Sequence, residues 1–287
     1  MKYAWIEDQS DHYAVSRICR VLGVSRTGYL QWRRRSPSAR QRRNDELGAQ
    51  LRMIHAETGH SYGRPRLWKA LAERGQRVGQ ERVRRLMALH GLRSVYKRPY
   101  RKTTQSAHDK PVAANLLNRQ FAPQRSDRIW VTDISYIATA EGWLYLAAVL
   151  DLGTRRVVGW SMAARMPAKL VCDALAMAYF RRRPPLGLIA HSDRGVQYAS
   201  AAYRGDLAKY GMQQSMSRKG NVWDNAPMES FFKTLKVERV YGQRYETRDQ
   251  ARSDIVNWIE GFYNRRRLHS ALRYRSPMQY EQSLKAA

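Results

Sequence analysis

Cysteine is scarce in this sequence of 287 residues. Only Cys19 and Cys172 occur, far apart in the chain and outside any CxxC or Cys/His spacing. The sequence therefore excludes a disulfide-stapled scaffold and gives no support for a zinc site. So few cysteines also suit a reducing intracellular compartment.

Long hydrophobic runs are missing as well. The longest uninterrupted apolar segment, Trp143 to Leu150, is far shorter than the roughly 18 to 20 residues that a membrane-spanning helix needs. The N-terminus carries Glu7, Asp8 and Asp11, where a secretory signal would place basic and then apolar residues. We therefore expect a soluble, cytoplasmic protein with no membrane association.

Acidic residues are in the minority. The chain has 24 Asp and Glu against 52 Lys and Arg, which leaves a formal net charge of +28. A chain so basic repels itself unless a polyanion neutralises it, and nucleic acid is the first candidate. The alternatives are a ribosomal-type binder, a membrane-surface protein and a solvated basic face. Charge alone says nothing about catalysis.

Two helix-turn-helix patterns occupy the first third of the chain. Residues 13–35 hold apolar residues at helical intervals, interrupted at residues 23–25, where Ser25 can cap a second helix. The pattern repeats over residues 65–91, and the last helix, from residue 80 to residue 90, has a basic polar side. The basic residues on that side are Arg82, Arg84 and Arg85. We expect residues 1–92 to be an all-α, helix-turn-helix-like DNA-binding region; the alternative is a structural hairpin with a solvated basic face.

Residues 93–123 are predicted to form a basic linker, because apolar residues thin out there while basic and polar ones accumulate. These residues are Lys97, Arg98, Arg101, Lys102, Thr103, Thr104 and Gln105. Residues 124–243 follow as a core and residues 244–287 as a C-terminal helical extension. The extension opens with a capping-box pattern from Thr247 to Gln250.

The core has a mixed α/β order. Three successive segments rich in β-branched and aromatic residues, 129–137, 143–150 and 156–162, suggest an antiparallel meander. A helix over 168–180, a short strand at 188–190, another helix, a strand near 213–217 and a final helix follow. This order predicts one central mixed sheet flanked by helices.

Three carboxylates stand at positions that favour a shared site. Asp133 lies inside the first strand, where an ionised group is costly unless it is paired or bound to metal. Asp193 follows a strand end, where α/β sheets gather ligands. Glu229 lies in the first turn of a helix capped by Asn225. Taken singly, each is better explained as a turn cap, a salt-bridged Asp or an ordinary helix Glu.

Together these carboxylates suit phosphodiester chemistry. Such chemistry uses one metal to activate the attacking oxygen and another to stabilise the leaving oxygen. Magnesium prefers carboxylate oxygens and leaves positions for water and phosphate. An acidic centre within a basic protein meets both demands, because Lys and Arg around it can hold the DNA backbone.

The motifs around the three carboxylates resemble those of the DDE transposases of bacterial insertion sequences, the integrase-like subunit encoded by the second reading frame (OrfB type), related to the retroviral integrase core. The matching segments are residues 130–136 (WVTDISY), 191–198 (HSDRGVQY) and 225–232 (NAPMESFF). Asp193 and Glu229 are separated by 35 residues (229 − 193 − 1), the family's spacing, and Lys236 follows at the expected seventh position. Residues 61–63 (SYG), 263–270 (YNRRRLHS) and Pro277 extend the resemblance over almost the whole chain.

This resemblance implies a ribonuclease-H-like core and a transposase that cleaves strands at insertion-sequence ends and joins them to target DNA. Asp133, Asp193 and Glu229 would be the catalytic residues and the ligands of Mg²⁺ or Mn²⁺, as two ions. The resemblance also implies a multimer on DNA in the bacterial cytosol, associated with the nucleoid, and an upstream-frame helix-turn-helix subunit as a partner. No HHCC zinc module precedes the core, so zinc is not expected.

Further basic residues are candidates for DNA contact. They are Lys233 and Lys236 on the helix of Glu229, and Arg265, Arg266 and Arg267 near the C-terminus. A solvated surface is the alternative for the arginines. We interpret His191 and Asp151 as structural residues, the latter as the start of a turn.

Two rival functions fit the same residues. A nuclease that hydrolyses without joining could use the same triad, and detection of joined product separates it from a transposase. A sequence-specific DNA-binding regulator, a catalytically inert descendant, is the other rival. The three intact carboxylates speak against it.

Overall fold

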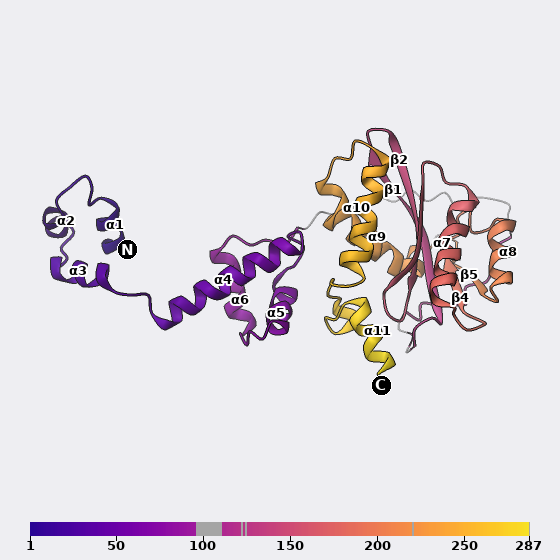
Figure 1. Ribbon diagram of the computed structural model, residues 1–287, viewed down its shortest axis with the longest axis horizontal. Helices are drawn as coiled ribbons and strands as arrows, with labels where there is room; N and C mark the ends of the chain where they lie inside the picture. Colours follow the sequence, from indigo (N-terminus) through magenta and orange to yellow (C-terminus); the bar gives the residue numbers. More distant parts are fainter. Residues whose placement is uncertain (96–110, 122, 124, 220, 287) are drawn as a thin grey trace.

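The computed structural model describes residues 1–95, 111–121, 123, 125–219 and 221–286 (Figure 1). The segment expected to be a basic linker lies largely outside the described residues, including every basic residue named for it. Within the described ranges, no helix is long and apolar enough to cross a membrane.

The N-terminal helices form two small units, each with its own core. The first unit consists of α1 (Lys2–Asp8), α2 (Val15–Val21) and α3 (Arg26–Arg34), which pack around Ile6, Ile18 and Tyr29. Ser25 caps α3 by accepting a hydrogen bond from the Gly28 amide, 3.3 Å away. The α2–α3 pair confirms the first predicted helix-turn-helix pattern, whereas α1 was not predicted.

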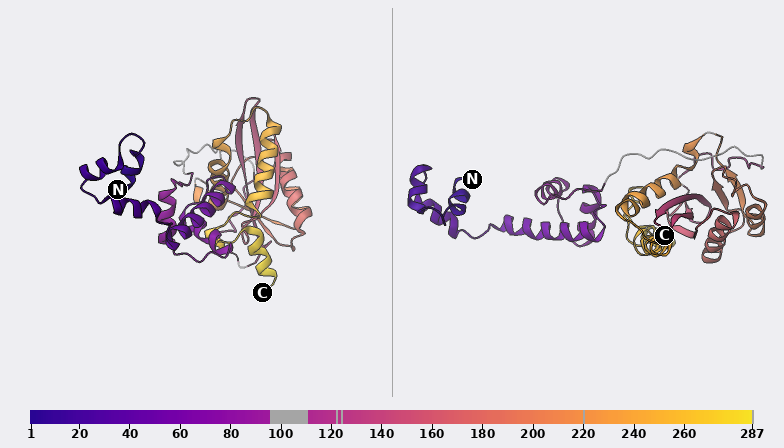
Figure 2. Two further views of the ribbon diagram at one scale, coloured as in Figure 1. Left: turned by 60° about the vertical axis from the view of Figure 1, so that its left-hand side comes forward. Right: turned by 90° about the horizontal axis from the view of Figure 1, so that it is seen from above.

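The second unit holds α4 (Ala39–Glu57), α5 (Arg64–Glu73) and α6 (Gln80–Leu89). Its core contains Leu51, Leu67, Leu71 and Val83. The α5–α6 pair confirms the second predicted pattern, and α4 is an additional helix of 19 residues. Figure 2 shows α4 as the bridge that keeps the first three helices away from the remainder of the molecule.

The core is built on one five-stranded sheet in the order β3-β2-β1-β4-β5. Its strands are β1 (Ile129–Thr139), β2 (Gly142–Asp151), β3 (Val157–Ala163), β4 (Ile189–Ser192) and β5 (Gln213–Met216). β1, β2 and β3 are antiparallel neighbours, while β4 and β5 run parallel to β1. The predicted meander and the predicted mixed sheet are therefore confirmed.

Helices cover both faces of the sheet (Figure 1). α7 (Ala168–Arg182) and α8 (Ala201–Lys209) pack on one face, against a cluster that includes Trp130 and Val149. α9 (Ala226–Glu238) and α10 (Arg248–Val256) pack on the other, against a cluster that includes Val131 and Leu150. Because side chains alternate along a strand, the odd-numbered residues of β1 near Val131 point toward α9.

After α10 the chain continues as a π-helical segment (Asn257–Tyr263), a short 3-10 turn (Ser270–Leu272) and α11 (Pro277–Lys285). Thr247 caps α10 by accepting from the Gln250 amide, but the Gln250 side chain accepts from the Glu246 amide, so the predicted capping box is only half formed. A complete box occurs instead at Ser276 and Gln279.

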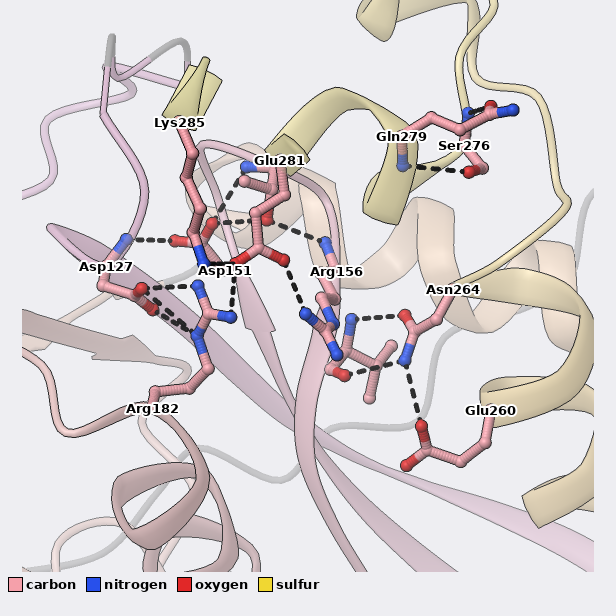
Figure 3. A network of polar contacts seen from close by, with 12 residues as sticks. Asp127, Asp151, Arg156, Arg182, Glu260, Asn264, Ser276, Gln279, Glu281 and Lys285 are labelled. Atoms are coloured by element: carbon pink, nitrogen blue, oxygen red, sulfur yellow. Dashed lines mark hydrogen bonds and ion pairs between the residues drawn. The ribbon is translucent and has the colours of Figure 1, made fainter. Parts of the chain in front are cut away.

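Buried polar contacts fasten this C-terminal extension to the core (Figure 3). Glu281 of α11 pairs with Arg156 at the start of β3 and with Arg182 at the end of α7. The Asn264 side chain accepts from the Val157 amide and donates to the Val157 carbonyl, both at 3.0 Å. The asparagine thus mimics a neighbouring strand at the sheet edge, which gives this residue of the 263–270 motif a structural role.

Candidate active site

β1 carries Asp133 at the centre of the sheet. The parallel pairing of β1 with β4 sets Val131 opposite His191. Extending this register by two residues places Asp133 opposite Asp193, which follows the end of β4 directly. Asp133 is partly exposed, and its carboxylate accepts a hydrogen bond from the Ile134 amide at 2.8 Å. Two of the three predicted carboxylates are therefore neighbours across adjacent strands.

Asp193 sits in a tight turn. Its carboxylate accepts a hydrogen bond from the Gly195 amide at 2.9 Å. A Cβ at Gly195 would lie 2.9 Å from the same carboxylate oxygen, so a larger residue there would displace the side chain. Glycine at this position therefore lets the Asp193 carboxylate fold back and accept the hydrogen bond from the Gly195 amide.

α9 brings Glu229 to the same face of the sheet. The helix begins at Ala226, has Pro227 in its first turn and buries Met228, Phe231 and Leu235 against the core. Glu229 is exposed in that first turn. The Asn225 side chain donates to the Thr132 carbonyl at 3.2 Å, which ties the start of α9 to β1 next to Asp133.

The charges of Asp193 and Glu229 both act on Asp133. Burial and the charge of Asp193 raise the pKa of Asp133 well above its usual range, and Glu229 adds to the rise. The Ile134 amide opposes this shift. A like charge raises a pKa only when it is close, which agrees with the prediction that these three carboxylates share a site.

Lys236 lies seven residues after Glu229 on α9 (236 − 229), about two helical turns away. Its ammonium nitrogen is 4.5 Å from the centre of the Tyr136 ring, an arrangement in which the ring face attracts the cation. Burial lowers the pKa of Lys236, and the charge of Asp133 opposes that shift. The helix face that carries Glu229 therefore also places a cation beside the carboxylates.

The donor set suits a hard divalent cation. It consists of carboxylate oxygens, which Mg²⁺ and Mn²⁺ prefer, and mutual repulsion among them is what a cation would relieve. The buried Asn225 Oδ1 close by has no hydrogen-bond partner among the described residues. As they stand, no three His, Cys, Asp or Glu side chains of the described residues are arranged to share one metal ion. The chemistry of the residues fits the ion, and closer approach of the side chains would be needed to bind it.

Sequence reasoning missed a buried acidic residue that organises this region. Asp224 is completely buried and accepts hydrogen bonds from the Arg218 amide and guanidinium, from Arg119 and from Asn115. The bonds from Arg218 are the first cause that lowers the pKa of Asp224. Asp224 directly precedes Asn225, so this network fixes the approach to α9. Its position next to the 225–232 motif was the available signal.

His191 and Asp151, which were interpreted as structural residues, are both buried and hydrogen-bonded. His191 is buried, with Ser215 Oγ 2.8 Å from its Nδ1 and Ser217 Oγ 3.3 Å from its Nε2. Burial lowers the pKa of His191 to about 4, which keeps the ring neutral. Asp151 is buried and accepts from the Thr154 amide and the Asp127 amide, both at 2.9 Å.

The predicted DNA-binding residues fall into different environments. Lys233, Arg265 and Arg266 are exposed. Arg267 is not: its side chain is only 6% exposed and forms two hydrogen bonds with Glu238, of 2.8 and 2.6 Å. The Arg267 guanidinium is therefore held by Glu238 in the interior, and the DNA contact expected at this residue stays a prediction.

On α6, Arg84 and Arg85 are exposed and pair with Glu81, three and four residues before them. Arg82 is half-buried and bonds Asn44 on α4 through its Nε and Nη2, at 3.0 and 2.8 Å. Arg82 thus holds the α4–α6 unit together, while Arg84 and Arg85 remain at its surface.

Two motifs from opposite ends of the chain meet beside α9. The Tyr62 hydroxyl donates to the Arg266 carbonyl at 3.1 Å and accepts from the Leu268 amide at 2.8 Å. Arg66 donates to the Leu268 carbonyl at 2.9 Å. The 61–63 segment and the 263–270 segment therefore form one contact that joins the α4–α6 unit to the core.

Family models cover most of the chain. The model described as "Integrase core domain" matches residues 123–222, and a second model of the same description matches residues 229–284. A model described as "HTH-like domain" matches residues 42–100. The first range contains Asp133 and Asp193, and the second begins at Glu229. The third covers most of the α4–α6 unit.

Named relatives match over nearly the full chain. One is the "Insertion element IS600 uncharacterized 31 kDa protein" of Shigella sonnei, 47% identical over 92% of this chain and 97% of that protein. Another is "Transposase InsF for insertion sequence IS3A" of Escherichia coli K12, 41% identical over 98% of each. Among solved structures, an intasome of simian T-cell lymphotropic virus in complex with PP2A regulatory subunit B56 gamma matches with a TM-score of 0.47 and 15% identity, covering 80% of this chain and 74% of that one.

Proposed function

Because the chain belongs to the family of insertion-sequence transposases with an integrase core domain, we propose that Asp133, Asp193 and Glu229 are the catalytic carboxylates of this transposase. It is an enzyme of the polynucleotidyl transferase type, acting in DNA transposition. The observation that carries the residue assignment is the register of β1 with β4, which sets Asp133 opposite Asp193, together with the Asn225 bond that ties the first turn of α9 to β1. Carboxylates on neighbouring elements of a protein of charge +28 are better explained by the binding of a cation than by a contribution to stability.

Dependence on a divalent metal is a property of the integrase core family. We infer that Mg²⁺, or Mn²⁺ in its place, is held as two ions by Asp133, Asp193 and Glu229. When bound, the pair would activate an attacking oxygen and stabilise a leaving oxygen at a DNA phosphate. The same carboxylates serve first the cleavage at the element end and then the attack of the released 3′ hydroxyl on target DNA.

Other residues of the chain would position the carboxylates and contact the DNA backbone. Asp133 is held on the central strand, and the Asn225 bond to Thr132 sets the first turn of α9, and so Glu229, against that strand. Lys236 and Lys233 on the same helix offer ammonium groups to the DNA backbone next to the carboxylates. Each transesterification exchanges one phosphodiester for another, so no energy source is needed.

DNA is the partner of this family, and we propose that element ends and target DNA both reach α9. Two ends must be held together, so a multimer on DNA is part of the proposal. We also propose a product of the upstream reading frame as a further subunit for end recognition, and the bacterial nucleoid as the place of action. Arg84, Arg85, Arg265 and Arg266 are proposed DNA contacts, since they are exposed and cationic.

Strand transfer with labelled element-end DNA tests the proposal. Wild-type protein with Mg²⁺ or Mn²⁺ should give joined product, and Glu229→Gln should reduce it by more than about 100-fold, because removal of a metal ligand is at least as damaging as the 10–100-fold loss for the residues around it. Glu46→Gln, at an exposed position of α4, is the matched control and should behave as wild type.

Cleavage without joining by wild type would favour a nuclease. DNA binding with neither cleavage nor joining, with the upstream-frame product supplied, would favour an inert regulator. Equal joined product from wild type and Glu229→Gln would remove Glu229 from the site.

A further inference from the structure

A cavity of about 360 Å³ lies beside α9, next to the candidate active site. Its lining includes Ser230 and Thr234, which are one turn apart on α9, and Ser230 directly follows Glu229. Three arginines from distant parts of the chain also line it, namely Arg66, Arg155 and Arg267. We call these five residues the arginine pocket.

The arginine pocket carries more positive than negative charge. Of the carboxylates near its guanidinium groups, Glu238 is hydrogen-bonded to Arg267 and lies 4.0 Å from Arg66. Asp151, which acts on Arg155, is already bonded to backbone amides. Three arginines thus face two carboxylates, of which Glu238 is bound to Arg267 itself and Asp151 to backbone amides, and the remaining partly desolvated positive charge attracts an anion.

Arg155 is held in place at a cost in backbone strain. It has a φ of 60° in the turn between β2 and β3, a left-handed conformation that non-glycine residues adopt infrequently. Its guanidinium donates to the Phe121 carbonyl at 2.9 Å. The turn thus directs the Arg155 side chain onto the core, and the bond to Phe121 holds it in the lining of the cavity.

The neighbouring histidine does not change the charge of the arginine pocket near neutral pH. His269 also lines the cavity. Burial, and then the charges of the three arginines, lower the pKa of His269 well below its usual range. The ring therefore stays neutral and supplies hydrogen-bonding atoms without a change of charge.

Size and continuity favour a nucleotide unit as the occupant. Ligand sites have volumes of about 300 to 1,000 Å³, and this cavity falls at the lower end. A second cavity, of about 420 Å³, shares Arg66, Ser230, Thr234 and Ser270 with the first and extends to Lys233. The two together follow the exposed side of α9 from the neighbourhood of Glu229.

We propose that the arginine pocket binds a backbone phosphate of the DNA strand that passes Glu229. Guanidinium groups bind phosphate oxygens through paired N–H donors, and the hydroxyl of Ser230 supplies a further donor from α9, whereas the Thr234 hydroxyl donates to the Ser230 carbonyl at 2.8 Å. Because Ser230 directly follows Glu229 on α9, a phosphate held in the pocket would fix the position of the strand relative to Glu229. This inference rests on the proposed function, since it takes DNA as the substrate.

Binding of a short single-stranded oligonucleotide, measured by fluorescence anisotropy in EDTA at several salt concentrations, tests the pocket. Arg155→Gln should weaken binding about tenfold near 0.1 M salt and lower the slope of log affinity against log salt by about 0.7, the share of one phosphate contact. Arg183→Gln is the matched control, because Arg183 is also a left-handed arginine, with a φ of 47°, but lies exposed at the end of α7. It should bind within about twofold of wild type.

A second variant guards against misfolding of the first. Ala271 is exposed and lines the cavity, so Ala271→Glu adds a carboxylate there without removing a contact. We expect it to weaken binding at least as much as Arg155→Gln. Ala202→Glu, at an exposed position of α8, adds the same charge elsewhere and should have little effect.

A binding experiment with inorganic phosphate distinguishes a site for free phosphate from a site for a DNA backbone phosphate. Radiolabelled phosphate bound to wild type should be lost in Ala271→Glu and displaced by the oligonucleotide. The proposal is overturned if phosphate stays bound when the oligonucleotide is saturating, if wild type binds no oligonucleotide, or if both pocket variants bind it with wild-type affinity and slope. Because no divalent ion is present, these results are independent of catalysis: failure of the pocket leaves wild-type strand transfer intact, whereas failure of the proposed function removes strand transfer and leaves DNA binding.

Discussion

The Asn225 side chain donates a hydrogen bond to the Thr132 carbonyl over 3.2 Å. This bond joins the residue before α9 to the residue before Asp133, so it sets two of the three proposed catalytic carboxylates relative to each other. The connection matters because Glu229 itself is exposed and has little packing of its own to hold it.

Asn225→Ala should therefore reduce strand transfer more than it reduces DNA binding. Loss of a buried hydrogen bond costs about 1–3 kcal/mol, and the first turn of α9 would then be free to shift Glu229. The measurement is the single-turnover rate of joining alongside affinity for element-end DNA. Asn221→Ala is the control, because it removes a side-chain hydrogen bond nearby, from the Trp223 amide, without touching β1. Similar rates for the two variants would contradict this account of Asn225.

Asp133→Asn should stabilise the metal-free protein. Burial and the neighbouring carboxylates raise the pKa of Asp133, so the folded state binds its proton more tightly than the unfolded state does, and ionisation opposes folding as pH rises above the unfolded pKa. Replacement by a neutral amide removes this opposition at pH 7. In EDTA, Tm should rise, each kcal/mol corresponding to about 2–4 °C for a chain of this size.

The exposed Asp45→Asn is the control for that measurement. Its Tm in EDTA should match wild type. Added Mg²⁺ should stabilise wild type and Asp45→Asn but leave Asp133→Asn unchanged. A lower Tm for Asp133→Asn in EDTA would show that the carboxylate has a structural partner instead of a strained environment.

His191 should make the fold sensitive to mild acid. Burial lowers the pKa of His191 to about 4, below its unfolded value near 6.5, so the unfolded state gains the proton first as pH falls. Stability is then fully present above about pH 6.5 and is lost progressively toward pH 4, by up to about 3 kcal/mol. Urea unfolding at pH 7 and pH 5 measures the loss, and it should be smaller in His191→Gln. An equal loss in the variant would assign the acid sensitivity to other groups.

Tyr62→Phe should loosen the contact between the α4–α6 unit and the core. The variant leaves the Leu268 amide and the Arg266 carbonyl without the tyrosine hydroxyl that serves both, at a cost of about 1–3 kcal/mol. Amide hydrogen exchange should accelerate in α5 and around residues 266–268. Tyr13→Phe, at an exposed position, should exchange as wild type does, and protection equal to wild type in Tyr62→Phe would contradict the role given to this hydroxyl.

Local patterns predicted the parts of the fold that depend on local sequence. The strands around Asp133 were evident from dense β-branched and aromatic residues, and β1 to β3 formed as expected because the connections between them are short. α4 was missed although Leu47, Leu51 and Ile54 follow a helical interval, since its first half is almost entirely polar and charged. Packing of the second half of α4 against α5 and α6 buries the apolar residues that stabilise the whole helix.

Long-range relationships were beyond the sequence. Strand positions, metal chemistry and motif spacing suggested that Asp133, Asp193 and Glu229 belong together, but the register of β1 with β4, which sets Asp133 opposite Asp193, comes only from the structure. The burial of Arg267 depends on Glu238, which lies 29 residues away, and on the Tyr62 contact, which spans more than 200 residues. No periodicity or composition can distinguish such an arginine from its exposed neighbours Arg265 and Arg266.

Anomalous diffraction from crystals soaked in Mn²⁺ tests the central claim most directly. The account predicts density for manganese between Asp133 and Asp193, with carboxylate oxygens about 2.1 Å from the ion, Glu229 turned toward it, and no such density in crystals of Asp133→Asn. Manganese bound elsewhere in wild type, or bound identically in the variant, would contradict the claim that these three carboxylates form the metal site of the transposase.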